Sequence, residues 1–193
     1  MEVDRGDFMD IPFVRAKDFY LRELRASDLD GPWYAWFNDA EVTRHQNKKI
    51  FPNTREKQRT YYEALLSSDK DVVLAIVDEK TKKHIGNVGL HKIDWIHRSA
   101  ELGIVLGNKA FWGRKIGKRA WALITAYGFQ VLNLNRIYAY VLKDNLASRK
   151  SAEAAGFVRE GTIREFMYKN GCYVDAFYMN VLKSDAPPLP VIQ

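Results

Sequence analysis

Residues 111–121, FWGRKIGKRAW, bring together glycines and cations that could bind a phosphate. Gly113 and Gly117 would let a ligand approach the backbone closely, and an apolar helical pattern begins at Ile116. A helix N-terminus presents unpaired N–H groups and the positive end of the helix dipole. Cations there oppose the dipole by roughly 0.3–1 kcal/mol each at low salt, and a bound anion would reverse that penalty. The stretch predicts a phosphate or pyrophosphate site; a solvated basic turn is the alternative. The cations are Arg114, Lys115, Lys118 and Arg119.

A carboxylate interrupts the apolar strand pattern SAELGIVLG at residues 99–107. With side chains alternating between two faces, Glu101 shares a face with Ser99, Gly103 and Val105. Burial in such a strand favours the protonated carboxyl and suits a group that accepts a proton during catalysis. Glu101 is therefore a candidate general base, and a salt-bridged glutamate on an edge strand is the alternative.

The histidines and the cysteine offer little chemistry by their spacing. The four histidines have no regular metal-ligand spacing, so we expect no metal site. His91, in a predicted strand, could line an acceptor pocket, although a surface or hydrogen-bonded histidine is the more frequent case. The single cysteine, Cys172, cannot form an internal disulfide, which favours a reducing compartment and a cytoplasmic protein.

The aromatic segment WYAWFNDAEVTRHQ, residues 33–46, could grip an amine acceptor. Its acidic residues would attract a protonated amine. Core packing is the more frequent fate of Trp33 and Trp36.

Composition indicates one globular domain that binds an anion. The chain has 193 residues, 47% of them hydrophobic, and a net charge of +6. No run approaches the roughly 18 apolar residues that span a bilayer, and the acidic start does not resemble a signal peptide. We expect an N-terminal arm at 1–17, a single domain at 18–184 and a Pro-rich C-terminal tail at 185–193.

Periodicity and turn signals predict a mixed α/β (α+β) fold with helices covering a mixed sheet. Asp30, before Pro32, is expected to cap a short helix, and Thr54 to cap the next. A later helix begins at Asn145 and stops at Gly156. Asn170-Gly171 marks the final hairpin. The expected strands are 18–26, 71–79, 84–94, 99–107 and RIYAYVLKD, then two strands around this turn.

Two segments, ELGIVLGNKAFWGRKIGKRAW and VLKDNLASRKSAEAAGFVREGTIRE, resemble the GNAT superfamily of acetyl-CoA-dependent acyltransferases. The similarity covers residues 18–183 and is greatest to the branch with ribosomal-protein N-terminal acetyltransferases. It implies a mostly antiparallel twisted sheet of about seven strands flanked by about four helices. The family's pyrophosphate loop, Gln/Arg-x-x-Gly-x-Gly/Ala, falls on residues 112–117. Trp112 stands at its first position, and Lys115 stands where glycine is usual, although lysine disfavours left-handed backbone.

The resemblance implies acetyl-CoA as the acetyl-donor co-substrate. Backbone N–H groups of residues 114–118 would hold its pyrophosphate, and the strand at 103–106 would pair with the pantetheine arm. The implied cofactor-binding residues are Ile104, Val105, Leu106, Trp112, Gly113, Arg114, Lys115, Ile116, Gly117, Lys118, Asn145 and Ser148.

The resemblance also implies an N-acetyltransferase acting on a primary amine. Glu101 matches the family's glutamate base, and Ala152 stands where a tyrosine often protonates the leaving thiolate, so the adjacent Ser151 is the candidate acid. The acceptor would be a protein N-terminus or a nucleotide-linked amino sugar, and polyamines and other small-molecule amines also fit. The candidate acceptor-binding residues are Trp36, Asn38, Arg44 and His91.

Two other functions compete with this one. An acyl-CoA-binding regulator without turnover would account for the missing tyrosine. A nucleic-acid-binding module is disfavoured, because the four cations span little more than one helical turn and no nucleic-acid motif accompanies them. We expect neither nucleic-acid nor membrane partners, and the late strands and the tail could form a homodimer.

Overall fold

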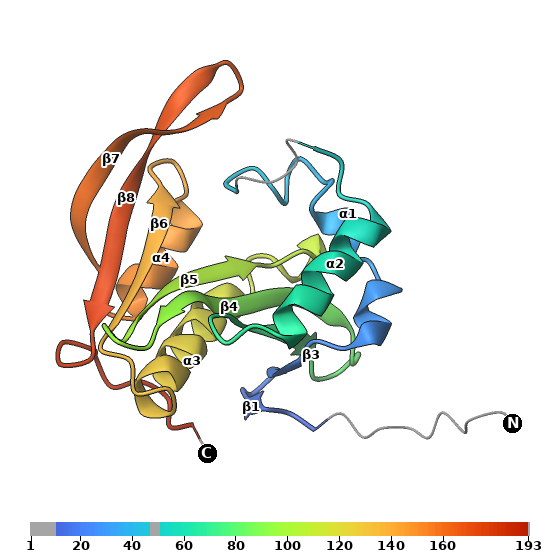
Figure 1. Cartoon of the computed structure of the whole chain (residues 1–193), viewed down its shortest axis with the longest axis horizontal. Coiled ribbons are helices and arrows are strands. Elements are labelled where there is room, and N and C mark those ends of the chain that lie inside the picture. The colour runs from blue at the N-terminus through green and yellow to red at the C-terminus, as the bar shows by residue number, and fades with distance from the viewer. Residues whose placement is uncertain (1–10, 47–50, 193) are drawn as a thin grey trace, which may run out of the picture.

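The strands of the chain form one twisted sheet in the computed structural model, which describes residues 11–46 and 51–192. Within these residues the sheet has eight strands in the order β1-β2-β3-β4-β5-β6-β8-β7 (Figure 1). The strands are β1 Val14–Arg15, β2 Phe19–Glu23, β3 Val72–Asp78, β4 His84–Asp94, β5 Ser99–Val105, β6 Arg136–Leu142, β7 Val158–Lys169 and β8 Cys172–Leu182. The mixed, mostly antiparallel fold is confirmed, with the short strand β1 in addition to the seven expected.

One junction in the sheet is parallel and short. All neighbours are antiparallel except β5 and β6, which pair only from Ser99 with Arg136 to Glu101 with Tyr138. Beyond Glu101 the two strands diverge (Figure 1). The sheet is therefore opened between β5 and β6.

Helices cover both faces of the sheet. Alternation along β3 sends Leu74 and Ile76 into the core under α3, and Ala75 and Val77 into a second core with Trp33. The helices are α1 Trp33–Trp36, α2 Arg55–Leu66, α3 Ile116–Gln130 and α4 Leu146–Ala154, with 3₁₀ turns at Ala26–Leu29 and Lys109–Phe111. No helix of the described residues is long and apolar enough to cross a membrane.

Helix caps were predicted correctly in two of three cases. The Thr54 hydroxyl accepts from the Lys57 amide at 3.2 Å at the start of α2. The Asn145 side chain accepts from the Ser148 amide at 3.1 Å at the start of α4. The prediction for Asp30 was wrong, because this residue ends the 3₁₀ turn and α1 starts after Pro32.

The C-terminal tail packs on the domain. Leu189 and Ile192 lie against the main core. The Gln130 side chain, at the end of α3, donates to the Pro190 carbonyl at 2.9 Å and accepts from the Ile192 amide at 3.0 Å. The tail is thus extended but held along α3.

Candidate active site

A cleft of about 1810 Å³ opens where β5 and β6 separate. Its walls are residues 102–106 of the β5 side and 139–142 of the β6 side. The N-terminal ends of α3 and α4 line the same cleft, and α2 with the segment 41–46 lines its other end. The cleft therefore connects the α3 N-terminus, where phosphate binding is predicted, with α2 and the segment 41–46, where the acceptor is predicted to bind.

The phosphate-binding end is built around a left-handed lysine. Lys115 is the N-cap of α3 with φ 60° and ψ 13°, so it adopts the conformation that favours glycine in this loop. Such backbone costs a non-glycine residue roughly 1–2 kcal/mol. The first intrahelical bond runs from the Arg119 amide to the Lys115 carbonyl, so the amides of residues 116–118 have no acceptor within the helix. These amides lie where the sequence predicts phosphate binding.

Two of the four cations of this stretch face the cleft. Lys115 and Lys118 line it. Arg119 instead pairs with Asp18, with 2.8 Å between Nη2 and Oδ2, and this hydrogen bond holds the pKa of Asp18 below its usual value. The Arg114 guanidinium lies 4.7 Å from the centre of the Phe111 ring and not in the cleft wall. The prediction that Arg114 meets the phosphates receives no support from this position.

Unpaired backbone on β5 faces the gap. Beyond Glu101, no pairing joins β5 to β6 within the described residues. Ile104, Val105 and Leu106 line the cleft, and the Ile104 carbonyl accepts from Gln46 Nε2 at 3.3 Å. The Trp112 indole donates to the Leu106 carbonyl at 2.7 Å, which ties the glycine-containing loop to the end of β5. An extended, amide-bearing ligand could pair here as an added strand.

Helix α4 brings Asn145, Ser148 and Ser151 to the opposite wall. The Asn145 side chain is engaged as the helix cap. The Ser151 hydroxyl donates to the Ala147 carbonyl at 2.8 Å, which commits its proton to the helix in this arrangement. Ala152 is fully buried.

Two neighbouring residues of β4 form polar pairs at the end of the cleft where the acceptor is predicted to bind. His91 Nδ1 lies 3.0 Å from Asp71 Oδ1, and Lys92 Nζ lies 2.8 Å from Glu101 Oε2. Glu101 is salt-bridged, as the alternative interpretation expected, but on an interior strand. Burial would raise the pKa of Asp71, but hydrogen bonds from Ser68 and His91 outweigh burial and lower it.

Two predicted acceptor residues lie outside the cleft wall of the described chain. Trp36 is 5% exposed and packs edge-on against His84 with ring centres 5.0 Å apart. The Asn38 side chain exchanges two hydrogen bonds of 2.8 Å with the Asn53 backbone before α2. Trp36 packs in the second core, and Asn38 fixes the backbone before α2, so neither side chain lines the cleft. Arg44 and His91 do line the cleft.

Contacts across the cleft were missed by sequence reasoning. Lys169, at the end of β7, donates to the Thr43 carbonyl at 2.8 Å and to the Gln46 carbonyl at 3.3 Å. His45 Nε2 lies 3.4 Å from Asp144 Oδ2. Burial lowers the pKa of both Lys169 and His45. No sequence signal could reveal these contacts, since the partners lie about a hundred residues apart.

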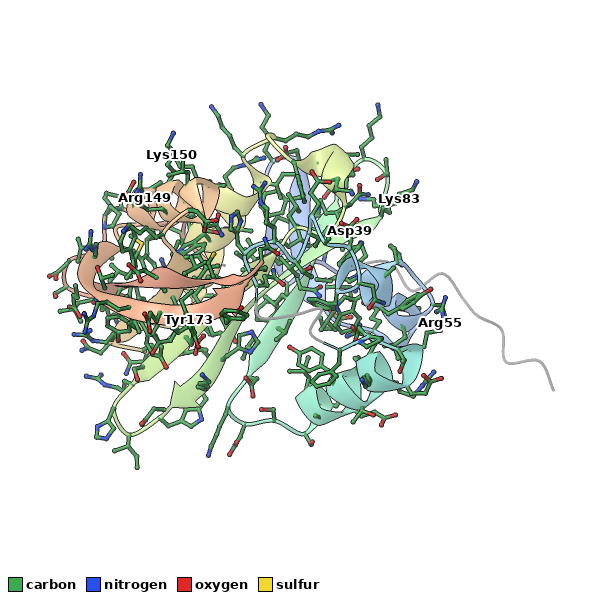
Figure 2. The ribbon with its side chains drawn as sticks, turned by 90° about the horizontal axis from the view of Figure 1, so that it is seen from above. Asp39, Arg55, Lys83, Arg149, Lys150 and Tyr173 are labelled. Atoms are coloured by element: carbon green, nitrogen blue, oxygen red, sulfur yellow. The ribbon has the colours of Figure 1, made fainter. Side chains whose placement is uncertain are left out.

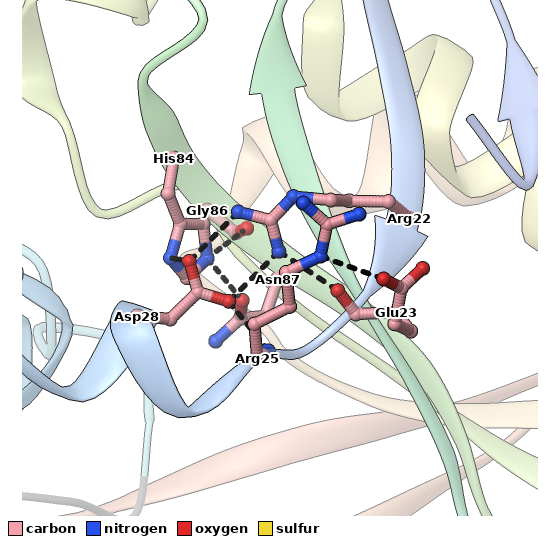
Figure 3. A network of polar contacts seen from close by, with 7 residues as sticks. All are labelled: Arg22, Glu23, Arg25, Asp28, His84, Gly86 and Asn87. Carbon is pink, nitrogen blue, oxygen red and sulfur yellow. Dashed lines mark hydrogen bonds and ion pairs between the residues drawn. The ribbon is translucent and has the colours of Figure 1, made fainter. Parts of the chain in front are cut away.

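A buried polar network supports the wall at the start of β4 (Figure 3). Arg22 and Asp28, each 6% exposed, form two hydrogen bonds of 2.8 Å. His84 Nδ1 lies 3.3 Å from Asp28 Oδ1. The Asn87 amide, which reaches the cleft, donates to His84 Nε2 at 2.6 Å and accepts from the Trp33 indole at 2.7 Å. The buried network thus holds the Asn87 side chain in place on the side away from the cleft.

Comparison with known proteins connects this geometry to acetyl transfer. The acetyltransferase (GNAT) domain model matches residues 18–158. Spermidine N(1)-acetyltransferase of Escherichia coli is 34% identical over 164 residues, 84% of this chain and 85% of that protein. A Bacillus subtilis protein named as a ribosomal N-acetyltransferase, YdaF, is 35% identical over 100 residues, 52% of this chain and 54% of that protein.

A solved structure shares the fold over most of its length. Spermidine N-acetyltransferase from Vibrio cholerae, crystallised in complex with CoA and spermine, matches with a TM-score of 0.80 and 27% identity. The match covers 87% of this chain and 97% of that one. Relatives of both the ribosomal and the spermidine type are therefore present, and the ribosomal branch is not singled out.

Proposed function

The chain belongs to the GNAT acetyltransferase family, and from this we propose that it transfers the acetyl group of acetyl-CoA to a primary amine of a small polyamine. The observation that carries the proposal is the cleft between the diverging strands β5 and β6, with the α3 N-terminus at one end. The polyamine is favoured over a protein N-terminus or an amino sugar because relatives that match most of the chain are named as spermidine acetyltransferases.

The walls of the cleft suit the acetyl donor. The amides of residues 116–118, with Lys115 and Lys118, would hold the pyrophosphate by hydrogen bonds and charge. The free backbone of β5 around Ile104 would pair with the pantetheine amides once Gln46 releases its carbonyl. Asn145 and Ser148 would face the cofactor from α4.

The acceptor end suits an amine that arrives as a cation. Glu41, Asp71, Glu101 and Asp144 line the cleft and would attract ammonium groups. Arg44, Lys57 and Lys92 line the same region, so the relatives rather than the charge balance carry the choice of polyamine. An ammonium must lose a proton before it can attack a thioester, and Glu101 is the base that the family pattern assigns. The Ser151 hydroxyl would give a proton to the departing thiolate once it no longer donates to the Ala147 carbonyl.

Turnover with competing acceptors tests the proposal. Release of CoA thiol is measured with acetyl-CoA and spermidine, spermine, a peptide with a free N-terminus or a nucleotide-linked amino sugar. We expect kcat/KM for spermidine or spermine to exceed the others by at least about tenfold, or about 1.4 kcal/mol of transition-state free energy. A preference for the peptide would replace the polyamine by a protein N-terminus.

The regulatory alternative has one observation in its favour, the alanine at position 152. Binding of acetyl-CoA without acetylation of any of these amines would support it. The nucleic-acid alternative is weakened by the engagement of Arg114 and Arg119 elsewhere. Figure 2 shows further basic side chains, Lys150, Lys83 and Arg55, on separate parts of the surface rather than in one stripe.

A further inference from the structure

Four polar side chains form one row across the sheet. His91 on β4 is opposite Glu101 on β5, and Glu101 is opposite Tyr138 on β6. Val72 pairs with Leu90, so Asp71 lies beside His91 at the start of β3. Side chains opposite one another in a sheet share a face. The row ends at Glu101 and Tyr138, the last pair before β5 and β6 separate, and so lies at the apex of the cleft.

Within this row, His91 is held in one orientation. Its Nδ1 lies 3.0 Å from Asp71 Oδ1, and the other carboxylate oxygen, Oδ2, accepts from the Ser68 hydroxyl at 2.8 Å. An ionised carboxylate only accepts hydrogen bonds, so Nδ1 carries the hydrogen of the neutral imidazole. Nε2 is left with a lone pair and can accept a proton.

The free nitrogen of His91 lies against β5. A Cβ atom added to Gly103 would come within 3.2 Å of both Nε2 and Cδ2 of the ring. Glycine at this position therefore leaves room for the imidazole edge beside the strand. The His91 side chain is 29% exposed and lines the cleft. Nε2 thus lies beside Gly103. The next residue of the strand is Ile104, whose backbone would pair with the acyl-bearing arm of the donor.

Glu101 is less suited to take the proton. Its Oε2 accepts from Lys92 Nζ at 2.8 Å. One of its two carboxylate oxygens is therefore engaged by a cation rather than free to meet the acceptor. A carboxylate held in this state can still attract and position an ammonium group.

We infer that His91, oriented by Asp71, is the general base that deprotonates the amine acceptor. The inference rests on the proposed function and changes its base from Glu101 to His91. The ammonium gives one proton to Nε2, and the resulting imidazolium is stabilised by Asp71. The amine nitrogen then attacks the thioester carbonyl carbon to form the C–N bond. The C–S bond breaks and the thiolate takes a proton from the Ser151 hydroxyl, which regains one as the nitrogen loses its second proton. The imidazolium then returns its proton to solvent.

Several titratable groups surround the pair and shape its pH dependence. Burial and the charge of Asp71 raise the pKa of Tyr61 to about 12, so this phenol stays neutral. Burial and then Glu101 raise the pKa of Tyr138. The groups facing His91 and Asp71 are Tyr61 from α2, Glu101 from β5, Tyr138 from β6 and Lys92 from β4 itself.

The pH dependence of kcat for spermidine, at saturating acetyl-CoA, tests the inference, because it reports groups in the enzyme–substrate complex. We expect the wild type to lose activity as His91 becomes protonated at acidic pH. His91→Gln should lower kcat by about 10²- to 10⁴-fold and remove this acid limb. Asp71→Asn should move the limb to lower pH, because an imidazolium without its carboxylate loses a proton more readily.

His97→Gln is the matched control, since His97 lies in the exposed turn after β4 and outside the cleft wall. It should leave kcat within about twofold. Affinity for acetyl-CoA, measured by calorimetry, should be the same in all variants if they fold.

Two results would overturn the inference, and they are distinguishable. If His91→Gln keeps the rate and the acid limb while Glu101→Gln loses both, Glu101 is the base and only the inference fails. If the wild type binds acetyl-CoA but acetylates none of the amines, the proposed function fails and the inference fails with it.

Discussion

Lys115 combines a strained backbone with a side chain that faces the cleft. It holds a left-handed conformation at the α3 N-cap while its side chain faces the cleft. Glycine would adopt this backbone without strain. If the cleft binds a phosphate at this end, as proposed, the charge of the lysine compensates for the strain.

Lys115→Gly should therefore raise the melting temperature by roughly 2–4 °C, the equivalent of about 1 kcal/mol in a chain of this size. The affinity for acetyl-CoA should fall by roughly tenfold, because a charged hydrogen-bond donor is lost. Lys82→Gly is the matched control: Lys82 is also left-handed, with φ 54°, but lies in the β3–β4 turn. It should stabilise without changing affinity. An unchanged affinity in Lys115→Gly would remove Lys115 from the phosphate site.

Asp28 makes the folded protein less stable as the pH falls into the acid range. Burial would raise its pKa, but contacts from Arg22 and His84 outweigh burial and hold the pKa far below its ordinary value of 3.8. A carboxyl whose pKa is lower in the folded state stabilises the fold above its unfolded pKa. The contribution should be complete above about pH 5 and decline as the pH falls below about 4.

Asp28→Asn should cost roughly 3–5 kcal/mol of unfolding free energy at neutral pH, because Arg22 keeps a buried charge without its carboxylate. Denaturant unfolding at pH 7 and pH 3 measures both effects, and the variant should lose less stability between these values than the wild type. The exposed Asp30→Asn should change stability by less than about 0.5 kcal/mol. Equal acid sensitivity in Asp28→Asn and the wild type would contradict the assignment.

At the scale of elements, local signals were readable and distant ones were not. The Thr54 and Asn145 caps and the Asn170-Gly171 turn depend on neighbours within a few residues, so sequence sufficed. The positions of Trp36 and Asn38 depend on partners in other elements, His84 and Asn53, which hold these side chains outside the cleft wall. The Lys92–Glu101 pair depends on strand register, which no local pattern fixes.

The β7–β8 hairpin and the segment before α2 are linked by Lys169. Its ammonium donates to the carbonyls of Thr43 and Gln46 across the cleft. Lys169→Met should remove both bonds and speed hydrogen–deuterium exchange of residues 41–46. Lys183→Met, which removes a bond to Asn133 away from the cleft, should not. Unchanged exchange in Lys169→Met would show that other contacts hold the segment.

At the scale of the molecule, the outer edge of the sheet is the surface that a second copy would cover. β7 is the last strand of the sheet, and the hairpin exposes Ile163, Tyr168 and Tyr173. Exposed apolar groups on an unpaired edge are typical of an interaction surface. The predicted homodimer would use this edge.

Light scattering should give twice the mass of the chain for the wild type and a single mass for Tyr168→Glu. Ile96→Glu, at an exposed apolar residue in the β4–β5 turn, should remain dimeric. A wild type that is monomeric at all concentrations would rule out the dimer. The division into arm, domain and tail stays a prediction.

The short parallel junction between β5 and β6 also has a mechanical consequence. The strands β1 to β5 follow one another in both chain and sheet, whereas β6, β8 and β7 form a second block that pairs with them over three residue pairs only. Other contacts between the blocks include α3 against α4 and the contacts of Lys169 and His45 across the cleft. Apart from the edge pair β1–β2, the strand pairing is shortest at this boundary, so a change in the angle between the blocks would break fewer strand-to-strand hydrogen bonds here than at the other junctions of the sheet. Such a change would alter the width of the cleft between β5 and β6, and so fit it to ligands of different thickness.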